Sequence, residues 1–268
     1  MTRPHPFEFL RHAWLKLYRY LHIARYQAYA SLRSEIEKNC IGMLWWFLEP
    51  LINALTLYFV FTVLFKNRDP KFLPFLLVGT FVFQWFSTSV SMSMTSIIGK
   101  LGLLQQVYLP KILLPLISIL NSTWKFLCAF SALLLFFTLL HTPPHWTLLA
   151  LPLIMLAQFL FILGVSLPLA ALIPYFRDGA TVVDAFMRLL MFVSGVFFTG
   201  SSVPGNVRGI FYLNPVAVLI EAYRAVVLQA AWPNWGQLGY VCGIGLGLSL
   251  VGLFILDKLD LALPKVSP

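Results

Sequence analysis

Long runs of apolar residues, separated by short polar connectors, make up most of the chain from residue 44 onward. A run of roughly 20 apolar residues is long enough for a helix to cross a lipid bilayer. The pattern predicts an all-α integral membrane protein. Its six transmembrane helices are expected over Leu44–Phe65, Phe72–Ile98, Ile112–Leu140, Trp146–Ile173, Thr181–Thr199 and Trp235–Leu256.

The first 43 residues have a different pattern. From Phe7 to Leu21 the apolar residues recur at steps of three and four, while Lys16 and Arg19 fall on another helical face. A basic amphipathic helix of this kind lies along the membrane surface. We therefore expect residues 1–43 to form a cytoplasmic, interfacial segment that is retained, because no continuous apolar stretch marks it as a signal peptide, and residues 44–268 to form the six-span domain.

The segment before the last span is too short and too polar to resemble the others. Residues 216–231 are apolar but include Glu221 and Arg224. This favours a re-entrant outer helical hairpin over about 201–231, with a seventh span through 216–231 as the alternative. Glu221 and Arg224 are three residues apart and share a helix face, so we expect them to form an ion pair.

Glycines also recur in the last span. Gly239, Gly243 and Gly247 are spaced by four and so share one helical face. Small residues at this spacing let two membrane helices approach closely. This face of the last span therefore permits close contact with another helix.

Composition agrees with a membrane protein, since 59% of the residues are hydrophobic, 11% are charged and the mean hydropathy is +0.82. Six spans use nearly all 268 residues, which leaves no room for a soluble catalytic domain. With six spans, thirteen of the 19 basic residues fall on the side of the N-terminus and five on the other side. The positive-inside rule then puts both termini in the cytoplasm.

The residues indicate neither an enzyme nor a metal protein. The phosphate-binding GxxxxGK[ST] pattern is absent, so we expect any ATP hydrolysis to come from a partner. Carboxylates and histidines are scattered, and Cys40, Cys128 and Cys242 show no CxxC spacing. We expect no catalytic residue, metal or cofactor in this chain, and no nucleic acid as a partner.

Two charged residues fall inside predicted spans. Lys125 lies near the middle of the third span, where a lysine costs roughly 2.5 to 3.5 kcal/mol unless it faces a cavity or a partner. Glu49 lies near the start of the first span. Counted along straight helices, the two differ in depth by roughly 10 Å, which makes a direct pair a poor interpretation. Snorkelling or local packing of Lys125 is the other possibility.

The second span is rich in hydroxyl groups along one face, with aromatic residues among them. Hydroxyls and aromatic rings together suit a surface along which a sugar polymer slides. The alternative is structural, because Ser and Thr also hydrogen-bond to their own helix and pack membrane helices closely. The candidate channel-lining residues are Thr80, Gln84, Trp85, Thr88, Ser91 and Lys125.

Three motifs together resemble a known family, the permease subunits of type 2 ATP-binding-cassette (ABC) polysaccharide exporters. They are IGMLWWFLEPL at 41–51, Tyr-Phe-Arg-Asp at 175–178, and Asn214-Pro215 followed by Glu221-x-x-Arg224. The resemblance covers the entire chain, although Ile41 stands where Leu is usual. These exporters handle O-antigen, capsular polysaccharide or teichoic acid.

The resemblance implies a homodimer with a channel at its two-fold interface, in the inner membrane of a bacterium. Two copies of a cytoplasmic ATPase, which bind ATP and Mg, would drive export of a polymer linked to undecaprenyl diphosphate or to a phospholipid. The resemblance further implies coupling to the ATPase by Tyr175, Phe176, Arg177 and Asp178, and an outer gate that includes Asn214, Pro215, Glu221 and Arg224.

Two further roles follow from residue chemistry within that picture. Arg25, Arg33 and Lys38 are basic residues at the cytoplasmic lipid interface, where they are placed to hold a diphosphate. Pro174 ends a helix and leaves the adjacent Tyr175 and Phe176 in a turn, as expected of a knob that docks on another protein. The alternative is that these two aromatics are interfacial belt residues.

Two other functions remain open from the sequence. One is a type 2 ABC exporter of a small molecule or drug, with similar spans. The other is an integral-membrane transferase acting on lipid-linked sugars. A transferase would need a cluster of carboxylates at one membrane face, which the sequence does not show.

Overall fold

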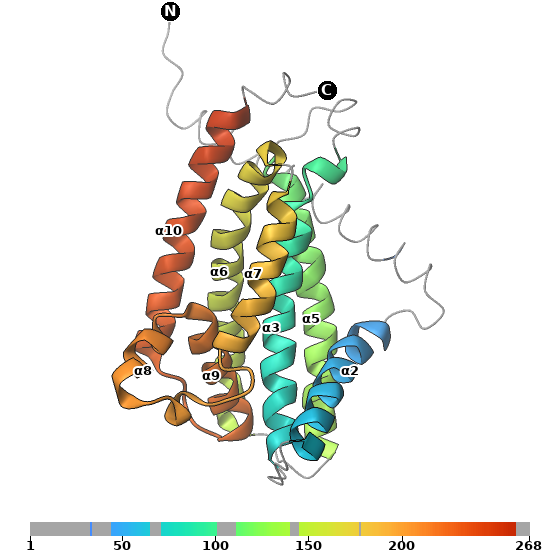
Figure 1. Cartoon of the computed structure of the whole chain (residues 1–268), viewed down its shortest axis with the longest axis vertical. Helices are drawn as coiled ribbons and strands as arrows, with labels where there is room; N and C mark the ends of the chain where they lie inside the picture. Colours follow the sequence, from blue (N-terminus) through green and yellow to red (C-terminus); the bar gives the residue numbers. More distant parts are fainter. Residues whose placement is uncertain are drawn as a thin grey trace, which may run out of the picture.

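A computed structural model describes residue 33 and residues 44–64, 71–100, 111–139, 145–176 and 178–260. Within these ranges the chain is helical and contains no strand, in agreement with the all-α prediction. The main elements are α2 (Trp45–Phe59), α3 (Phe72–Met94), α5 (Leu113–Leu139), α6 (Leu151–Leu172), α7 (Gly179–Val193), α8 (Gly205–Tyr212), α9 (Pro215–Leu228) and α10 (Trp235–Asp260) (Figure 1).

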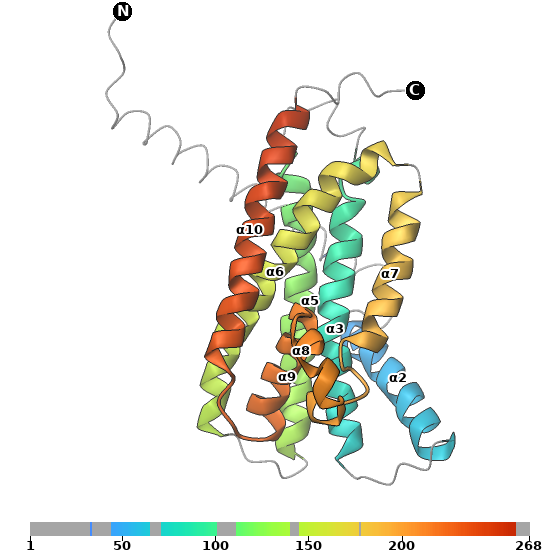
Figure 2. The same ribbon diagram turned by 60° about the vertical axis from the view of Figure 1, so that its left-hand side comes forward.

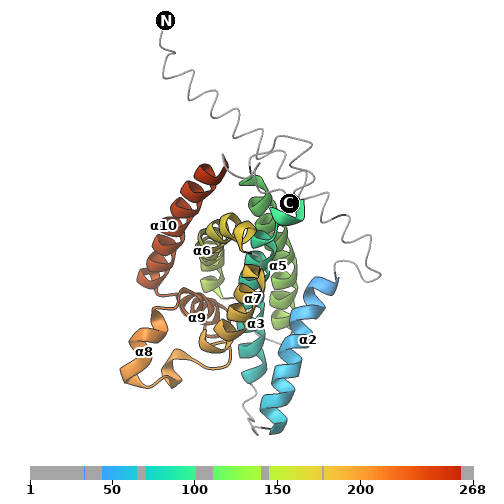
Figure 3. The same cartoon turned by 45° about the horizontal axis from the view of Figure 1, so that its top comes forward.

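Four helices are long and apolar enough to cross a membrane: α3, α5, α10, and α6 extended by the short turns at Trp146–Ala150 and Ile173–Tyr175. They confirm four of the expected spans as helices. The chain is therefore a multi-pass membrane protein. Figure 3 shows α10 and α2 on opposite sides of the bundle, with α3, α5 and α6 between them.

Two expected spans are shorter helices. α2 and α7 have 15 residues each, a length of about 22 Å against roughly 30 Å of hydrocarbon. α2 continues into a π-helical turn at Val60–Leu64. The expectation that the fifth span runs to Thr199 is wrong. α7 ends at Val193 because the Ser194 hydroxyl donates to its own helix at Leu190 O (2.7 Å) and Gly195 then adopts a positive φ of 72°.

α8 and α9 form a bent pair, with an angle of 96° between them. Both lie at the end of the bundle where α10 begins, here called the hairpin end (Figures 1 and 2). Asn214 sets the bend: its side chain accepts from Val216 N (3.0 Å) and donates to Ser194 Oγ (2.9 Å), and Pro215 takes the first helical position. The described part of the chain thus has four spans by length and composition, or five if the bent pair is counted as one.

The predicted glycine ridge of α10 is not the face that packs against α6. Within the described residues, a Cβ added at Gly239, Gly243 or Gly247 would meet nothing within 4 Å. Instead, a Cβ at Gly245 would come within 2.8 Å of the Leu160 backbone on α6, and one at Gly252 within 2.7 Å of Pro168. α10 therefore uses glycines seven residues apart, two helical turns, for its close approach to α6.

Candidate functional site

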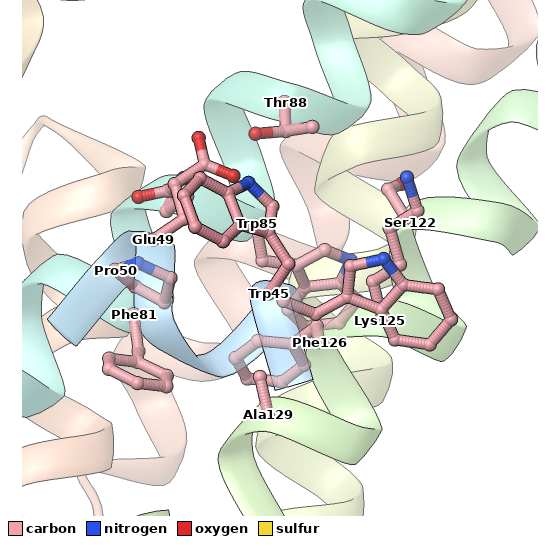
Figure 4. A pocket seen from close by; sticks show the side chains of 12 residues that line it. Trp45, Glu49, Pro50, Phe81, Trp85, Thr88, Ser122, Lys125, Phe126 and Ala129 are labelled. Carbon is pink, nitrogen blue, oxygen red and sulfur yellow. The ribbon is translucent and has the colours of Figure 1, made fainter. Parts of the chain in front are cut away.

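The central pocket lies between α2, α3 and α5 (Figure 4). It has a volume of about 130 Å³, and each of the three helices contributes four of its lining residues. These are Trp45, Trp46, Glu49 and Pro50 from α2, Phe81, Gln84, Trp85 and Thr88 from α3, and Ser122, Lys125, Phe126 and Ala129 from α5. The lining combines indole and phenyl rings with a lysine, a carboxylate, an amide and two hydroxyls.

The structure brings together four of the six candidate channel residues in the central pocket: Gln84, Trp85, Thr88 and Lys125. The other two lie elsewhere. Thr80 is a buried residue outside the pocket lining, and Ser91 donates to Asp184 Oδ1 of α7 (2.6 Å). The hydroxyl face of α3 therefore does not line one continuous surface. Part of it lines the central pocket, and part of it packs against other helices.

Some hydroxyl groups of α3 have the structural role that was the alternative to channel lining. Ser89 donates to Trp85 O (2.6 Å) and contacts Ser122 Oγ of α5 (2.6 Å). Thr95 donates to Ser91 O (3.1 Å). These hydroxyls satisfy their own helix or join α3 to α5.

Glu49 and Lys125 both line the central pocket. Counting residues along straight helices separated their depths, yet α2 and α5 bring both residues to the lining of one pocket (Figure 4). Lys125 Nζ lies 5.8 Å from the centre of the Trp46 ring. A cation over an indole face gains electrostatic stabilisation that offsets part of its removal from water.

Three of the pocket aromatics, Trp45, Trp46 and Phe126, were not singled out from the sequence. Phe126 stacks on Trp85 with ring centres 4.2 Å apart. Within the described residues, Trp85 Nε1 is buried without a hydrogen-bond partner. The stacked rings of Trp85 and Phe126 thus give the pocket a flat apolar wall. Tryptophans are enriched at membrane interfaces, so Trp45 and Trp46 at the start of a span do not by themselves indicate a pocket.

Arg224 of α9 is fully buried and is held by the main chain. Its guanidinium donates to Phe75 O (3.1 and 3.2 Å), Gly195 O (2.6 Å) and Val196 O (2.7 Å), and it stacks 3.4 Å from the centre of the Phe75 ring. The predicted ion pair with Glu221 is therefore wrong. The carbonyls freed where α7 ends are stronger competitors for a buried guanidinium, because they would otherwise be unsatisfied.

Glu221 instead ties the hairpin to the loop before it. Its Oε1 accepts from Gly200 N (2.6 Å), and the Tyr212 hydroxyl donates to the same carboxylate. Gly200 is required at this point, because a Cβ there would collide with the Tyr212 hydroxyl and Glu221 Oε1. Glu221 and Arg224 thus fix the two sides of one loop, 194–204, to α9.

No metal centre is formed by the part of the chain that the structure describes, where no three His, Cys, Asp or Glu residues gather.

Comparison with known proteins assigns the family. The family model described as "ABC-2 type transporter" matches residues 31–228. This chain belongs to the ABC-2 type transporter family. Membership identifies it as a transport permease and implies partnership with an ABC ATPase. The match covers the central pocket and all of α9.

Curated relatives match most of the length of this ABC-2 permease. An O-antigen export system permease protein RfbA of Klebsiella pneumoniae is 27% identical over 230 residues, which cover 85% of this chain and 88% of the relative. A protein of the same name from Myxococcus xanthus is 27% identical over 221 residues, covering 82% of this chain and 85% of the relative.

The remaining candidate sites of this ABC-2 permease lie at the opposite end of the bundle from the hairpin or outside the described residues. Tyr175 and Phe176 follow α6 and are exposed, Phe176 by 62%. Asp178 is also exposed, and Arg177 lies outside the described residues. Of the basic N-terminal residues, Arg25 and Lys38 lie outside them too, and Arg33 is an exposed helical residue.

Proposed function

We propose that this permease exports a lipid-linked polysaccharide, of O-antigen or capsule type, from the cytoplasm across the inner membrane. The central pocket carries the proposal, because it places indole and phenyl rings beside an amide, hydroxyls and a lysine between α2, α3 and α5. Sugar rings have apolar faces and a rim of hydroxyls, which match such a lining. The names of the curated relatives support the same class of cargo.

The working exporter in this proposal contains two copies of the chain and two copies of a cytoplasmic ABC ATPase. The ATPase binds ATP and Mg²⁺, and the permease needs no cofactor of its own. α7 offers a face for the second copy: Val182, Phe186, Leu189 and Val193 form an exposed apolar stripe along one side. Within the described residues this stripe is uncovered, whereas Asp184 on the other side contacts α3.

The proposed topology has six crossings with both termini in the cytoplasm. The helical stretch 45–64 and α7 complete the four longer spans, and the hairpin end faces outward. Asn214, Pro215, Glu221 and Arg224 then hold the outer gate. Tyr175, Phe176, Arg177 and Asp178 meet the ATPase, and Arg25, Arg33 and Lys38 receive the diphosphate of the lipid carrier.

The test is to delete the gene and to complement the deletion with single variants. The amount of polymer on the cell surface and the amount of lipid-linked polymer inside the cell are then measured. Deletion should remove surface polymer and accumulate the lipid-linked form. Lys125→Met and Thr88→Val should lower surface polymer by about tenfold. Thr95→Val is the matched control, since Thr95 lies on the same helix but outside the central pocket. Normal surface polymer in the deletion strain would refute the function, and loss of drug efflux there would favour a small-molecule exporter.

A further inference from the structure

A second pocket lies beside the hairpin, and it differs from the central pocket in character. This hairpin pocket has a volume of about 360 Å³ and is bounded by the loop after α7, by α9 and by the start of α10. Its polar lining includes Ser201, Tyr212, Glu221, Gln229, Asn234 and Gln237. The volume lies within the range of about 300 to 1,000 Å³ that is usual for small-ligand sites.

The charged groups at the hairpin pocket are already engaged. Arg224 reaches its wall, but the guanidinium is bound to three main-chain carbonyls. Glu221 accepts from Gly200 N and from Tyr212. A phosphate or another anion would therefore meet a carboxylate without a free cation beside it. Among the described residues, no group of three His, Cys, Asp or Glu is present to hold a metal ion.

The hairpin pocket offers a ligand neutral hydrogen-bond donors and acceptors. The side-chain amides of Gln229 and Gln237 make no hydrogen bond to any other part of the described chain. Each offers two N–H donors and one carbonyl acceptor. Asn234 differs, because its Oδ1 caps α10 by accepting from Gly236 N (3.1 Å) and Gln237 N (3.3 Å). Paired donors and acceptors on two sides of a cavity match vicinal hydroxyl groups.

We propose that the hairpin pocket binds a neutral sugar residue of the exported polymer, held by the amides of Gln229 and Gln237 beside the Tyr212 ring. This inference rests on the proposed function, since it takes the cargo to be a polysaccharide. A sugar bound there contacts the end of α9 and the start of α10 at once. It therefore engages the polymer on the far side of the bundle from the ATPase.

The test uses the full chain in detergent and a photoreactive probe. The probe is the mixture of one- and two-repeat oligosaccharides released by mild acid from the surface polymer of cells that carry the gene, labelled at the reducing end with a diazirine. After irradiation, labelled peptides are mapped by mass spectrometry. We expect labelling within 199–212 and 229–237, reduced at least fivefold by excess unlabelled oligosaccharide.

Variants distinguish specific binding in the hairpin pocket from non-specific labelling. Gln229→Ala combined with Gln237→Ala should reduce labelling at least fivefold, while Gln→Asn at both positions should recover part of it. Asn206→Ala is the matched control, an exposed amide on α8 outside the pocket, and should leave labelling unchanged. Size-exclusion profiles and melting temperatures confirm that each variant is folded.

Three outcomes would overturn the proposal: labelling that falls outside the two peptides, labelling that excess oligosaccharide does not compete, or labelling that survives the double Ala variant. A diazirine-bearing phosphatidylglycerol is run in parallel, and labelling of the pocket by that lipid instead of the oligosaccharide would identify a headgroup site and refute the sugar. The deletion strain tests export independently. A normal surface polymer in that strain refutes the proposed function, whereas lost polymer with no labelling refutes only this pocket.

Discussion

At the scale of single residues, Arg224 is the most informative side chain in the molecule. A guanidinium presents five N–H donors in a fixed plane, and here that plane spans carbonyls from α3 and from the loop after α7. Gly79 makes room for it, because a Cβ at 79 would collide with the Arg224 Nη2 atom. One side chain thus joins three segments that are up to 149 residues apart in the sequence.

Replacing Arg224 should destabilise the protein more than any surface change. Arg224→Met leaves the carbonyls of Phe75, Gly195 and Val196 without donors, and each buried unsatisfied carbonyl costs roughly 1 to 3 kcal/mol. We expect a loss of about 3 kcal/mol, measured by thermal or denaturant unfolding in detergent. Arg208→Ala is the control, since Arg208 also donates to two carbonyls, Ser201 O and Val203 O, but is exposed.

The same experiment distinguishes main-chain binding from an ion pair. If Arg224 mainly balanced Glu221, removing both charges would be milder than removing one. Because Glu221 has its own partners in Gly200 and Tyr212, we expect Arg224→Met with Glu221→Gln to be less stable than either single variant. A double variant as stable as Glu221→Gln alone would restore the ion-pair interpretation.

At the scale of helices, the contact between α6 and α10 depends on backbone proximity. A Cβ added at Gly245 would lie 2.8 Å from backbone atoms of Leu160 and Phe161, so a methyl group there forces the helices apart. Gly245→Ala should therefore cost about 1 to 3 kcal/mol of stability, the usual cost of overpacking. Gly243→Ala is its matched control on the same helix, because its Cβ would meet nothing within 4 Å in the described chain. Equal melting temperatures for the two variants would contradict this packing.

The helices show where sequence reasoning succeeds and where it stops. Apolar length predicted α3, α5, α6 and α10 to within a few residues, because bilayer thickness fixes that length. The face of α10 that packs against α6 was not identified, since a GxxxG spacing says that a helix can approach closely but not which helix meets which face. The early end of α7 also involves Ser194 and Gly195, which hydrogen-bond to Asn214 and Arg224 in other segments.

The candidate site was predictable only in part for a related reason. Gln84, Trp85, Thr88 and Lys125 could be chosen because polar and aromatic side chains inside an apolar span need a physical explanation. Glu49 could not be assigned to the same pocket as Lys125, because the packing of α2 against α5 cannot be read from residue count. Likewise, Gln229 falls in the predicted hairpin and Gln237 in the predicted last span, and only the packing of α9 and α10 brings them to one cavity.

At the scale of the whole molecule, the two ends of the bundle are specialised. The hairpin end holds the hairpin pocket and the loop fixed by Glu221 and Arg224, whereas the opposite end exposes the turn after α6 (Figure 2). α6 and α3 run between these ends, so a displacement at one end can reach the other through packed helices. This arrangement suits a permease whose ATPase lies on one side of the membrane and whose cargo leaves on the other.

The exposed turn after α6 allows a test of whether the ATPase binds at the end opposite the hairpin. Phe176 is 62% exposed next to Tyr175, and aromatic side chains are over-represented among the residues that dominate protein interfaces. Phe176→Ala should therefore lower co-purification of the ATPase, and the stimulated ATP hydrolysis of the complex, by about tenfold, while the permease keeps its melting temperature and its size-exclusion profile. Ile210→Ala is the control, because Ile210 is 68% exposed at the hairpin end and should leave the ATPase bound. Retained ATPase in the Phe176 variant, or equal loss in both variants, would show that the turn after α6 is an interfacial belt and that coupling occurs elsewhere.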